Sequence, residues 1–383
     1  MNDFELHGHL IGRQGSRRDL NTPVLIVDIE ALDRNIATMA AFAAANGLAL
    51  RPHAKTHKSP DIARRQIAAG AIGSCCAKLG EAEALADGGV TTGLHITSPV
   101  VSPPAIARLV ALNARTEGLM CVVDNPANVA AIAAANGAAN AGGKPLTLII
   151  DVDPGIRRTG VASPAAAVEV LAAIRAEPSL IYAGVQYYCG MQQHVPSYAD
   201  RATAMAERAD YLRSVIAALA KAGGPPSIVT GGGTGTHRID AGLDLFTELQ
   251  VGSYVFMDSQ YLACALTTEG PSPFETALMI DARVVSNNAA GMVTLDAGFK
   301  AFSTDAEPPL VLAGAPEGAK YFFMGDEHGA LICPEGNAPG LSEVVTLVAP
   351  HCDPTVNLYD TYHVVAGNTL QALWPVAGRG RSR

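Results

Sequence analysis

The residues best suited to chemistry in this sequence lie in the octapeptide Arg51 to Lys58, which reads RPHAKTHK. It follows a short apolar run, residues 47–50, and contains five basic or imidazole side chains. A lysine at the carboxyl end of a strand can attack an aldehyde when neighbouring cations lower its pKa. The octapeptide therefore predicts a Schiff-base lysine, with a basic surface loop or a phosphate patch as the alternatives.

A second candidate is the glycine-rich stretch Thr230 to Thr236, TGGGTGT, at the end of an apolar run. Successive glycines expose backbone N–H groups that can surround a phosphate. The stretch lacks the Lys-Ser/Thr ending of a nucleotide-hydrolysing loop, and it lies too late for a first-strand dinucleotide fingerprint. It predicts phosphate binding, with a flexible turn as the alternative.

Arg157 and Arg158 follow another apolar run and a Pro-Gly turn. An arginine held there could donate hydrogen bonds to an oxyanion such as a phenolate. From the residues alone, a surface ion pair with Asp151 or Asp153 is equally open.

A metal site is predicted at His351 and Asp353, within the segment PHCDP (350–354). In an extended chain these two side chains project to the same side, while Cys352 points away. Imidazole plus carboxylate suits Mn²⁺ or Mg²⁺, and two protein ligands leave coordination positions open for catalysis. The alternatives are a histidine satisfied by a turn aspartate, and Cys352 as a ligand, which would favour zinc.

The elements that position these motifs alternate between short β-branched runs and Ala-rich helical stretches from residue 22 to 252. Such alternation predicts parallel strands with helical crossovers, and eight units would close a barrel with active residues at the strands' carboxyl ends. There are nine strand candidates, so we expect the first to belong to another domain. The candidates are Val24–Asp28, Gly47–Arg51, Ile72–Cys76, Leu94–Ser98, Leu119–Val123, Leu146–Asp151, Tyr182–Tyr187, Ser227–Thr230 and Glu248–Gly252.

After about residue 256, strand-like runs are separated by Gly, Pro and Asn instead of helices, which predicts an antiparallel β domain. We therefore expect a barrel over residues 22–260 and a β domain over 261–378. The expected β-domain strands are Thr276–Val285, Gly291–Asp296, Lys320–Met324, Gly329–Cys333, Ser342–Val348 and Tyr362–Ala366.

The composition narrows the function classes. The 383 residues are 49% hydrophobic and carry a net charge of −9, which argues against a nucleic-acid-binding surface. No apolar stretch has the length of a signal peptide or a bilayer span. Seven irregularly spaced cysteines are typical of reduced thiols, so we expect a cytoplasmic protein without a nucleic-acid or membrane partner.

Together these motifs resemble the fold-type III pyridoxal-phosphate (PLP) enzymes, and within them the D-threonine aldolase and D-serine dehydratase family. The resemblance runs nearly end to end, through Thr22–Asp28, Arg51–Lys58, Glu248–Asp258, Asp296–Lys300, Glu327–Gly329 and the 350–354 segment. It implies an alanine-racemase-like (β/α)8 barrel that binds PLP, an antiparallel β domain that brings the metal and includes the first strand, and a homodimer.

The resemblance also implies residue roles. Lys55 would carry the cofactor as a Schiff base, Arg158 would contact the phenolic oxygen, and Gly232, Gly233 and Thr234 would bind the phosphate. Gln186 and Gln193 fall where dehydratase relatives have tyrosines that touch the cofactor. Tyr187 is predicted from the residues themselves: it lies in a stretch, residues 186–194, that ends a strand and could line a ring-shaped cofactor, with core packing as the alternative. The general base would be His194, a metal-bound hydroxide or another imidazole such as His57.

The choice of reaction depends on Asp353. By this resemblance, dehydratases of the family have a His-x-Cys motif with zinc at this position, whereas D-threonine aldolases have a His-x-Asp motif with manganese. The resemblance therefore favours an aldolase that uses PLP and Mn²⁺, with Mg²⁺ or Zn²⁺ as alternatives, and cleaves D-β-hydroxy-α-amino acids to glycine and an aldehyde. The alternative function is dehydration of D-serine or D-threo-3-hydroxyaspartate to an oxoacid and ammonia.

Overall fold

The computed structural model describes residues 1–139, 144–334 and 337–383. The chain divides into two compact units, each assembled from several segments. The barrel unit consists of Met39–Gly252, Cys264–Pro271 and Gly380–Arg383, and the sheet unit consists of Met1–Thr38, Ser253–Ala263 and Ser272–Arg379. Helix α2 (Ile29–Ala45) contributes residues to both units.

The described part of the barrel unit contains an eight-stranded parallel sheet in the order β2-β9-β8-β7-β6-β5-β4-β3. Its two end strands also meet. The Ile72 N–H donates to Leu50 O and the Cys75 N–H donates to Pro52 O, each at 2.8 Å, so the sheet closes on itself. This confirms the predicted barrel. The strands are β2 Ala49–Leu50, β3 Ser74–Cys76, β4 Leu94–Ile96, β5 Met120–Val123, β6 Leu146–Val152, β7 Leu180–Tyr187, β8 Ile228–Gly231 and β9 Glu248–Leu249.

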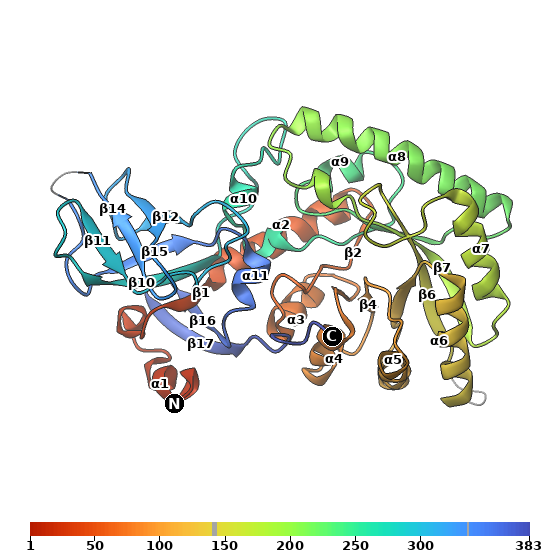
Figure 1. The fold of residues 1–383 in the computed structure, drawn as a ribbon, viewed down its shortest axis with the longest axis horizontal. Coiled ribbons are helices and arrows are strands. Elements are labelled where there is room, and N and C mark those ends of the chain that lie inside the picture. Colours follow the sequence, from red (N-terminus) through yellow and green to blue (C-terminus); the bar gives the residue numbers. More distant parts are fainter. Residues whose placement is uncertain (140–143, 335–336) are drawn as a thin grey trace. The chain divides into compact units, whose positions relative to one another are not determined.

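Helices connect the barrel strands, and α5, α6 and α7 lie along the outside of β4 to β7 (Figure 1). Proline in the first turn of α3, α5 and α7 supplies the φ that a helix start needs. Ser163 and Ser197 cap α7 and α8 by accepting backbone N–H groups. The helices are α3 Pro60–Ala68, α4 Leu79–Asp87, α5 Pro103–Arg115, α6 Pro126–Ala139, α7 Pro164–Arg175, α8 Tyr198–Lys221 and α9 His237–Ala241.

The sheet unit is built around β1 (Val24–Asp28), which pairs antiparallel with β10 and parallel with β16. The strand order is β13-β14-β11-β10-β1-β16-β17, and β15 pairs with both β10 and β12. Leu25, Ile26 and Val27 are fully buried, which contributes roughly 1.5–3 kcal/mol for each side chain. The other strands are β10 Leu278–Ser286, β11 Met292–Leu295, β12 Leu310–Ala313, β13 Lys320–Phe323, β14 Gly329–Ile332, β15 Val344–Val348, β16 Thr361–Ala366 and β17 Thr369–Pro375.

Two short helices of the sheet unit matter for the site: α10 (Ser259–Leu262) and α11 (Cys352–Val356). All seven cysteines are buried free thiols. Among the described residues, helices that combine the length and apolar character of a membrane span are absent.

Candidate active site

The carboxyl ends of the barrel strands surround a cavity of about 670 Å³. Its lining residues lie at or just beyond the ends of β2 to β7 and β9. Functional side chains gather at this end of a parallel barrel, because the loops there vary without disturbing the strands. Three of the predicted site residues line this cavity: Lys55, Arg158 and Gln186.

The structure distinguishes the two lysines of the octapeptide. Lys55 lines the cavity, whereas Lys58 does not. The Lys58 Nζ lies 3.2 Å from Glu81 Oε1, and the two side chains are only 7% and 5% exposed. Lys58 is thus held in a buried ion pair, and Lys55 is the lysine positioned to meet an aldehyde in the cavity.

The positive field that the octapeptide suggests is largely balanced by carboxylates. The Arg51 guanidinium forms two hydrogen bonds to Glu248, at 3.0 and 3.1 Å, and both residues are buried. Burial raises the pKa of Glu248, but the hydrogen bonds and charge of Arg51 outweigh it, so the pKa is lowered. Lys58 is paired as well. The reactivity expected of Lys55 therefore rests on its position in the cavity, and not on a group of unpaired cations around it.

His53 fixes the backbone beside Lys55. Its Nδ1 accepts the Lys55 N–H at 3.3 Å, so the ring hydrogen lies on Nε2. The Nε2 then donates to Thr97 Oγ1 at 3.1 Å, and the Thr97 hydroxyl donates to Cys76 O at 3.2 Å. This chain of hydrogen bonds ties the loop after β2 to the ends of β3 and β4.

Gln186 lies in the floor of the cavity with its side-chain amide fully engaged. Its Nε2 donates to Asp151 Oδ1 at 2.9 Å and to Thr97 O at 3.2 Å. Its Oε1 accepts from Gln250 Nε2 at 3.1 Å and lies 3.0 Å from His95 Nε2. Burial lowers the pKa of His95 to about 4, so this imidazole is neutral and donates from Nε2. Gln186 therefore shapes the floor but retains no open hydrogen-bonding position for a cofactor.

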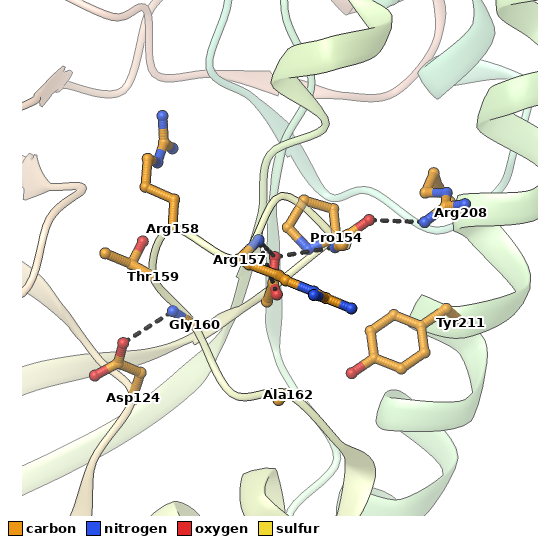
Figure 2. Close-up of a pocket in the computed structure, with 11 residues that line it drawn as sticks. Asp124, Pro154, Arg157, Arg158, Thr159, Gly160, Ala162, Arg208 and Tyr211 are labelled. Carbon is orange, nitrogen blue, oxygen red and sulfur yellow. Dashed lines mark hydrogen bonds between the residues drawn. The ribbon is translucent and has the colours of Figure 1, made fainter.

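Arg157 and Arg158 leave their loop in different directions (Figure 2). Arg158 lines the Lys55 cavity and also a second cavity of about 690 Å³, whereas Arg157 lines only the second. Arg157 has a φ of 60°, a rare conformation for a side chain of this kind, and its N–H donates to Asp153 Oδ1 at 3.0 Å. Because the backbone turns at Arg157, the two side chains point in different directions, and Arg158 is the one that lines the cavity with Lys55.

The predicted phosphate loop directly follows β8 and rests on Gln193. The Gln193 Oε1 accepts the Gly235 N–H at 3.0 Å, and its Nε2 donates to Thr236 Oγ1 at 3.0 Å. A Cβ at Gly233 would collide with the Gln193 amide, which explains the glycine. Gln193 thus supports the loop from beneath. Neither Gln193 nor Gly232, Gly233 or Thr234 is among the residues that line the two cavities.

Asp240 lies under the same loop and is fully buried. Its Oδ2 accepts the Thr236 hydroxyl at 2.5 Å, while its Oδ1 has no hydrogen-bond partner within the described chain. Burial raises the pKa of Asp240 to about 7. A protonated carboxyl group there is compatible with an anion bound by the loop, whereas a carboxylate would repel it.

Two other predicted residues lie outside the cavities. Tyr187 is buried with its hydroxyl donating to Arg208 O at 2.9 Å, and the neighbouring Tyr188 lines the cavity instead. His194 is exposed and lines neither cavity. The predictions for Tyr187 and His194 therefore gain no support from their placement.

His351 and Asp353 converge, although the local structure differs from the extended segment that we expected. His351 has an extended backbone, but helix α11 begins at Cys352. The His351 Nε2 lies 3.4 Å from Asp353 Oδ2, and Cys352 is buried with its Sγ 3.6 Å from Met257 O. Two donors on one ion lie about 3.0–3.5 Å apart when each bond is about 2.1 Å, so this pair fits a divalent ion.

Two further carboxylates surround this pair. Asp305 Oδ2 lies 2.7 Å from His351 Nδ1. Burial lowers the pKa of His351, but Asp353 and Asp305 outweigh it and raise the pKa to about 9. Asp258 is buried and accepts the backbone N–H of Cys352 at 2.9 Å and of Tyr261 at 3.1 Å. Asp258 thus holds the backbone of the 350–354 segment in place.

Among its described residues, the sheet unit contains one other cluster of potential ligands, formed by Asp3, His7 and His363. The His7 Nε2 accepts the Asn21 N–H at 3.0 Å, so its Nδ1 carries the hydrogen and donates to His363 Nε2 at 2.8 Å. Burial lowers the pKa of both imidazoles, that of His363 to about 4. The hydrogen bonds engage both nitrogens of His7 and the Nε2 of His363, so this cluster ties the amino-terminal helix α1 (Asp3–His7) to β16.

The structure also adds cavity residues that the motifs did not single out. These are Lys78, Thr97, Asp124, Thr159, Tyr188 and Gln250, together with His53 of the octapeptide. The sequence feature that could have identified them is their position, because each lies at the carboxyl end of a barrel strand or a few residues beyond it.

Comparisons with known proteins agree with this arrangement. Residues 27–260 match the model of the alanine racemase N-terminal domain, and residues 277–365 match that of a putative serine dehydratase domain. A D-threonine aldolase from Arthrobacter sp. is 38% identical, with 95% of this chain and 94% of that protein covered. A 3-hydroxy-D-aspartate aldolase from Paracoccus denitrificans (strain Pd 1222) is 36% identical, with 95% and 93% covered.

The dehydratase branch is more distant. A D-threo-3-hydroxyaspartate dehydratase from Delftia sp. (strain HT23) is 32% identical over 75% of this chain and 73% of that protein. Among solved structures, D-threonine aldolase from Filomicrobium marinum has a TM-score of 0.90 and 36% identity, covering 96% of this chain and 97% of that one. The chain therefore belongs to the alanine racemase N-terminal-domain family and, within it, to the D-threonine aldolase and D-serine dehydratase family.

Proposed function

We propose that this chain is a PLP- and divalent-metal-dependent aldolase that cleaves D-β-hydroxy-α-amino acids, such as D-threonine, to glycine and an aldehyde. The observation that carries this proposal is the His351–Asp353 pair, whose nitrogen and oxygen donors lie 3.4 Å apart. A racemase has no use for such a pair, and an imidazole with a carboxylate favours Mn²⁺ or Mg²⁺ over a thiolate-bound ion.

The barrel unit supplies the cofactor site. When bound, PLP withdraws the electron pair that is released as the Cα–Cβ bond breaks. Lys55 in the cavity is the amine that holds it, and Arg158 donates hydrogen bonds to its phenolic oxygen. The loop of Gly232, Gly233 and Thr234 binds the phosphate. The amides of Gly233 and Gly235 already donate to Thr236 and Gln193, so a bound phosphate would rely on other N–H groups of this loop.

The sheet unit supplies the metal site. A divalent ion there lowers the pKa of the substrate's β-hydroxyl, so that a base can remove its proton. His351 and Asp353 hold this ion, and Mn²⁺ is the ion we propose. The two imidazoles suggested as the base, His194 and His57, are absent from the cavity lining. His53, which was not suggested, is part of that lining.

A product assay tests the function. The protein is incubated with D-threonine, PLP and Mn²⁺, and glycine plus acetaldehyde is measured against 2-oxobutyrate plus ammonia. We expect glycine and acetaldehyde in equal amounts, with activity lost on chelation and restored by Mn²⁺. The oxoacid and ammonia would instead establish dehydration, the reaction of the more distant relative.

Paired variants test the metal assignment. Asp353→Ala should abolish cleavage and leave the absorbance of bound PLP unchanged. Cys352→Ser is the control, since the buried Cys352 thiol faces Met257 O and should be dispensable for metal binding. If Asp353→Ala stays fully active after chelation, the metal assignment is wrong.

We further propose a cytoplasmic homodimer. Apolar side chains that are about half exposed recur on three strands of the sheet unit: Leu310 and Leu312 on β12, Phe322 on β13 and Ile332 on β14. Such side chains favour burial against a second subunit. The mass of one chain is 39.5 kDa, and sedimentation velocity at micromolar concentration should give twice that mass.

A further inference from the structure

The His351 imidazole lies between two carboxylates on opposite sides of its ring. Asp305 Oδ2 is 2.7 Å from Nδ1, and Asp353 Oδ2 is 3.4 Å from Nε2. The two ring nitrogens point away from each other, so Nδ1 and Nε2 cannot both bind the same ion. An ion that Nε2 shares with Asp353 therefore lies on the side of the ring away from Asp305.

We propose that Asp305 is a positioning residue that orients His351 for the metal. By accepting the Nδ1 hydrogen, Asp305 fixes the tautomer in which the Nε2 lone pair faces Asp353. A carboxylate in this role also makes the imidazole a better donor. This inference rests on the proposed function, because it assumes that His351 and Asp353 hold a divalent ion.

The surroundings of Asp305 support this role. Ser303, two residues earlier, is tied to residues 351–355 twice: its N–H donates to Thr355 Oγ1 at 3.0 Å, and its Oγ donates to His351 O at 3.2 Å. The loop that carries Asp305 is therefore fixed relative to His351. In the described part of the chain, Asp305 pairs with no lysine or arginine, and His351 is its one ionic partner.

The neighbouring carboxylate, Asp258, does not share this role. Both of its oxygens accept backbone N–H groups, from Cys352 and Tyr261. Asp258 therefore holds the main chain, Asp353 faces the open Nε2 side of the imidazole, and Asp305 occupies the Nδ1 side. Each of the three carboxylates has a distinct task.

The test is the affinity of the PLP-loaded protein for Mn²⁺. After removal of metal, Mn²⁺ is titrated and the free ion is followed by electron paramagnetic resonance. Asp305→Ala should raise the dissociation constant for Mn²⁺ by about 10- to 100-fold. Asp305→Asn should raise it less, because the amide oxygen still accepts the Nδ1 hydrogen. Saturating Mn²⁺ should restore most of kcat in both variants, but not in Asp353→Ala.

Asp360→Asn is the matched control, since Asp360 is an exposed carboxylate of the same unit that pairs with Arg379. It should bind Mn²⁺ like the unaltered protein, which excludes a general effect of lost negative charge. If Asp305→Ala does not fold, Asp305→Asn carries the comparison.

Two failures are distinguishable. If the unaltered protein binds Mn²⁺ and Asp305→Ala or Asp305→Asn binds it equally well, Asp305 has no positioning role and the proposed function stands. If the unaltered protein binds no Mn²⁺, the metal requirement of the proposed function is wrong, and the role of Asp305 is wrong with it.

Discussion

Lys55 and Lys58 are only three residues apart, yet their surroundings differ enough to separate reactivity from stability. Lys55→Ala should abolish the visible absorbance of bound PLP and leave the free energy of unfolding nearly unchanged. Lys58→Ala leaves Glu81 buried without its cation and should lower the free energy of unfolding by roughly 3–5 kcal/mol. Absorbance spectra and urea unfolding of both variants check this. Retention of the spectrum by Lys55→Ala would exclude Lys55 as the cofactor lysine.

Lys78 follows β3 and is a cation of the cavity without an ion-pair partner in the described chain. The nearby Glu81 is already paired with Lys58 and accepts the Ala77 N–H. We expect Lys78 to bind the substrate's carboxylate, a charged interaction of about 1.5–3 kcal/mol. Lys78→Met should therefore raise the KM for D-threonine by about 10- to 100-fold with little change in kcat. Lys221→Met, at the end of α8, is the control.

At the residue scale, strand ends and motifs were enough to predict that Lys55, Arg158 and Gln186 lie near one another at one end of the barrel. The hydrogen-bond and ion-pair partners of the octapeptide could not be predicted. Arg51 is neutralised by Glu248, which lies 197 residues further along the chain. Short-range patterns contain no information on such a pairing, so the octapeptide appeared more strongly cationic than it is. The partner of the His53 Nε2 is likewise remote in sequence, since it is Thr97, the residue that follows β4.

At the scale of elements, the loop after β8 depends on the protonation of Asp240. The pKa of Asp240 in the folded protein is raised to about 7. Its contribution to the free energy of unfolding is therefore complete below the ordinary pKa of 3.8, falls as the pH rises above that value, and is lost once the pH has passed 7. At about 1.4 kcal/mol per unit, the loss is on the order of 4 kcal/mol. Asp240→Asn stays neutral and should be more stable than the unaltered protein at pH 9. Urea unfolding from pH 5 to 9 measures this, and parallel curves for the two proteins would contradict it.

The barrel strands were predictable because each is a short apolar run between helical stretches. Two strands of the sheet unit were not predicted. β12 (Leu310–Ala313) is a four-residue apolar run between Pro308-Pro309 and Gly314, which was an available strand signal. β17 (Thr369–Pro375) forms a hairpin with β16, and the Gly367-Asn368 turn before it was an available signal. Helix α11 was missed because five residues are too few for a helical period to appear.

At the scale of the molecule, the proposed PLP site and the proposed metal site belong to different units. Lys55 lies in the barrel unit, and His351 with Asp353 lies in the sheet unit. A ligand stabilises the unit that binds it. In differential scanning calorimetry of the metal-free apoprotein, PLP should raise the unfolding temperature of the barrel unit and Mn²⁺ that of the sheet unit. Limited proteolysis assigns each transition, and a shift of the wrong transition would contradict the assignment.

The central position of β1 has a consequence for synthesis on the ribosome. β1 is among the first strands to emerge, but its two partners, β10 and β16, belong to the last third of the chain. At about 5–20 residues per second, its apolar face waits for tens of seconds while the whole barrel is translated. During that time the nascent chain exposes an unpaired strand, which makes β1 the natural binding site for a chaperone and the point where slowed translation would most promote aggregation.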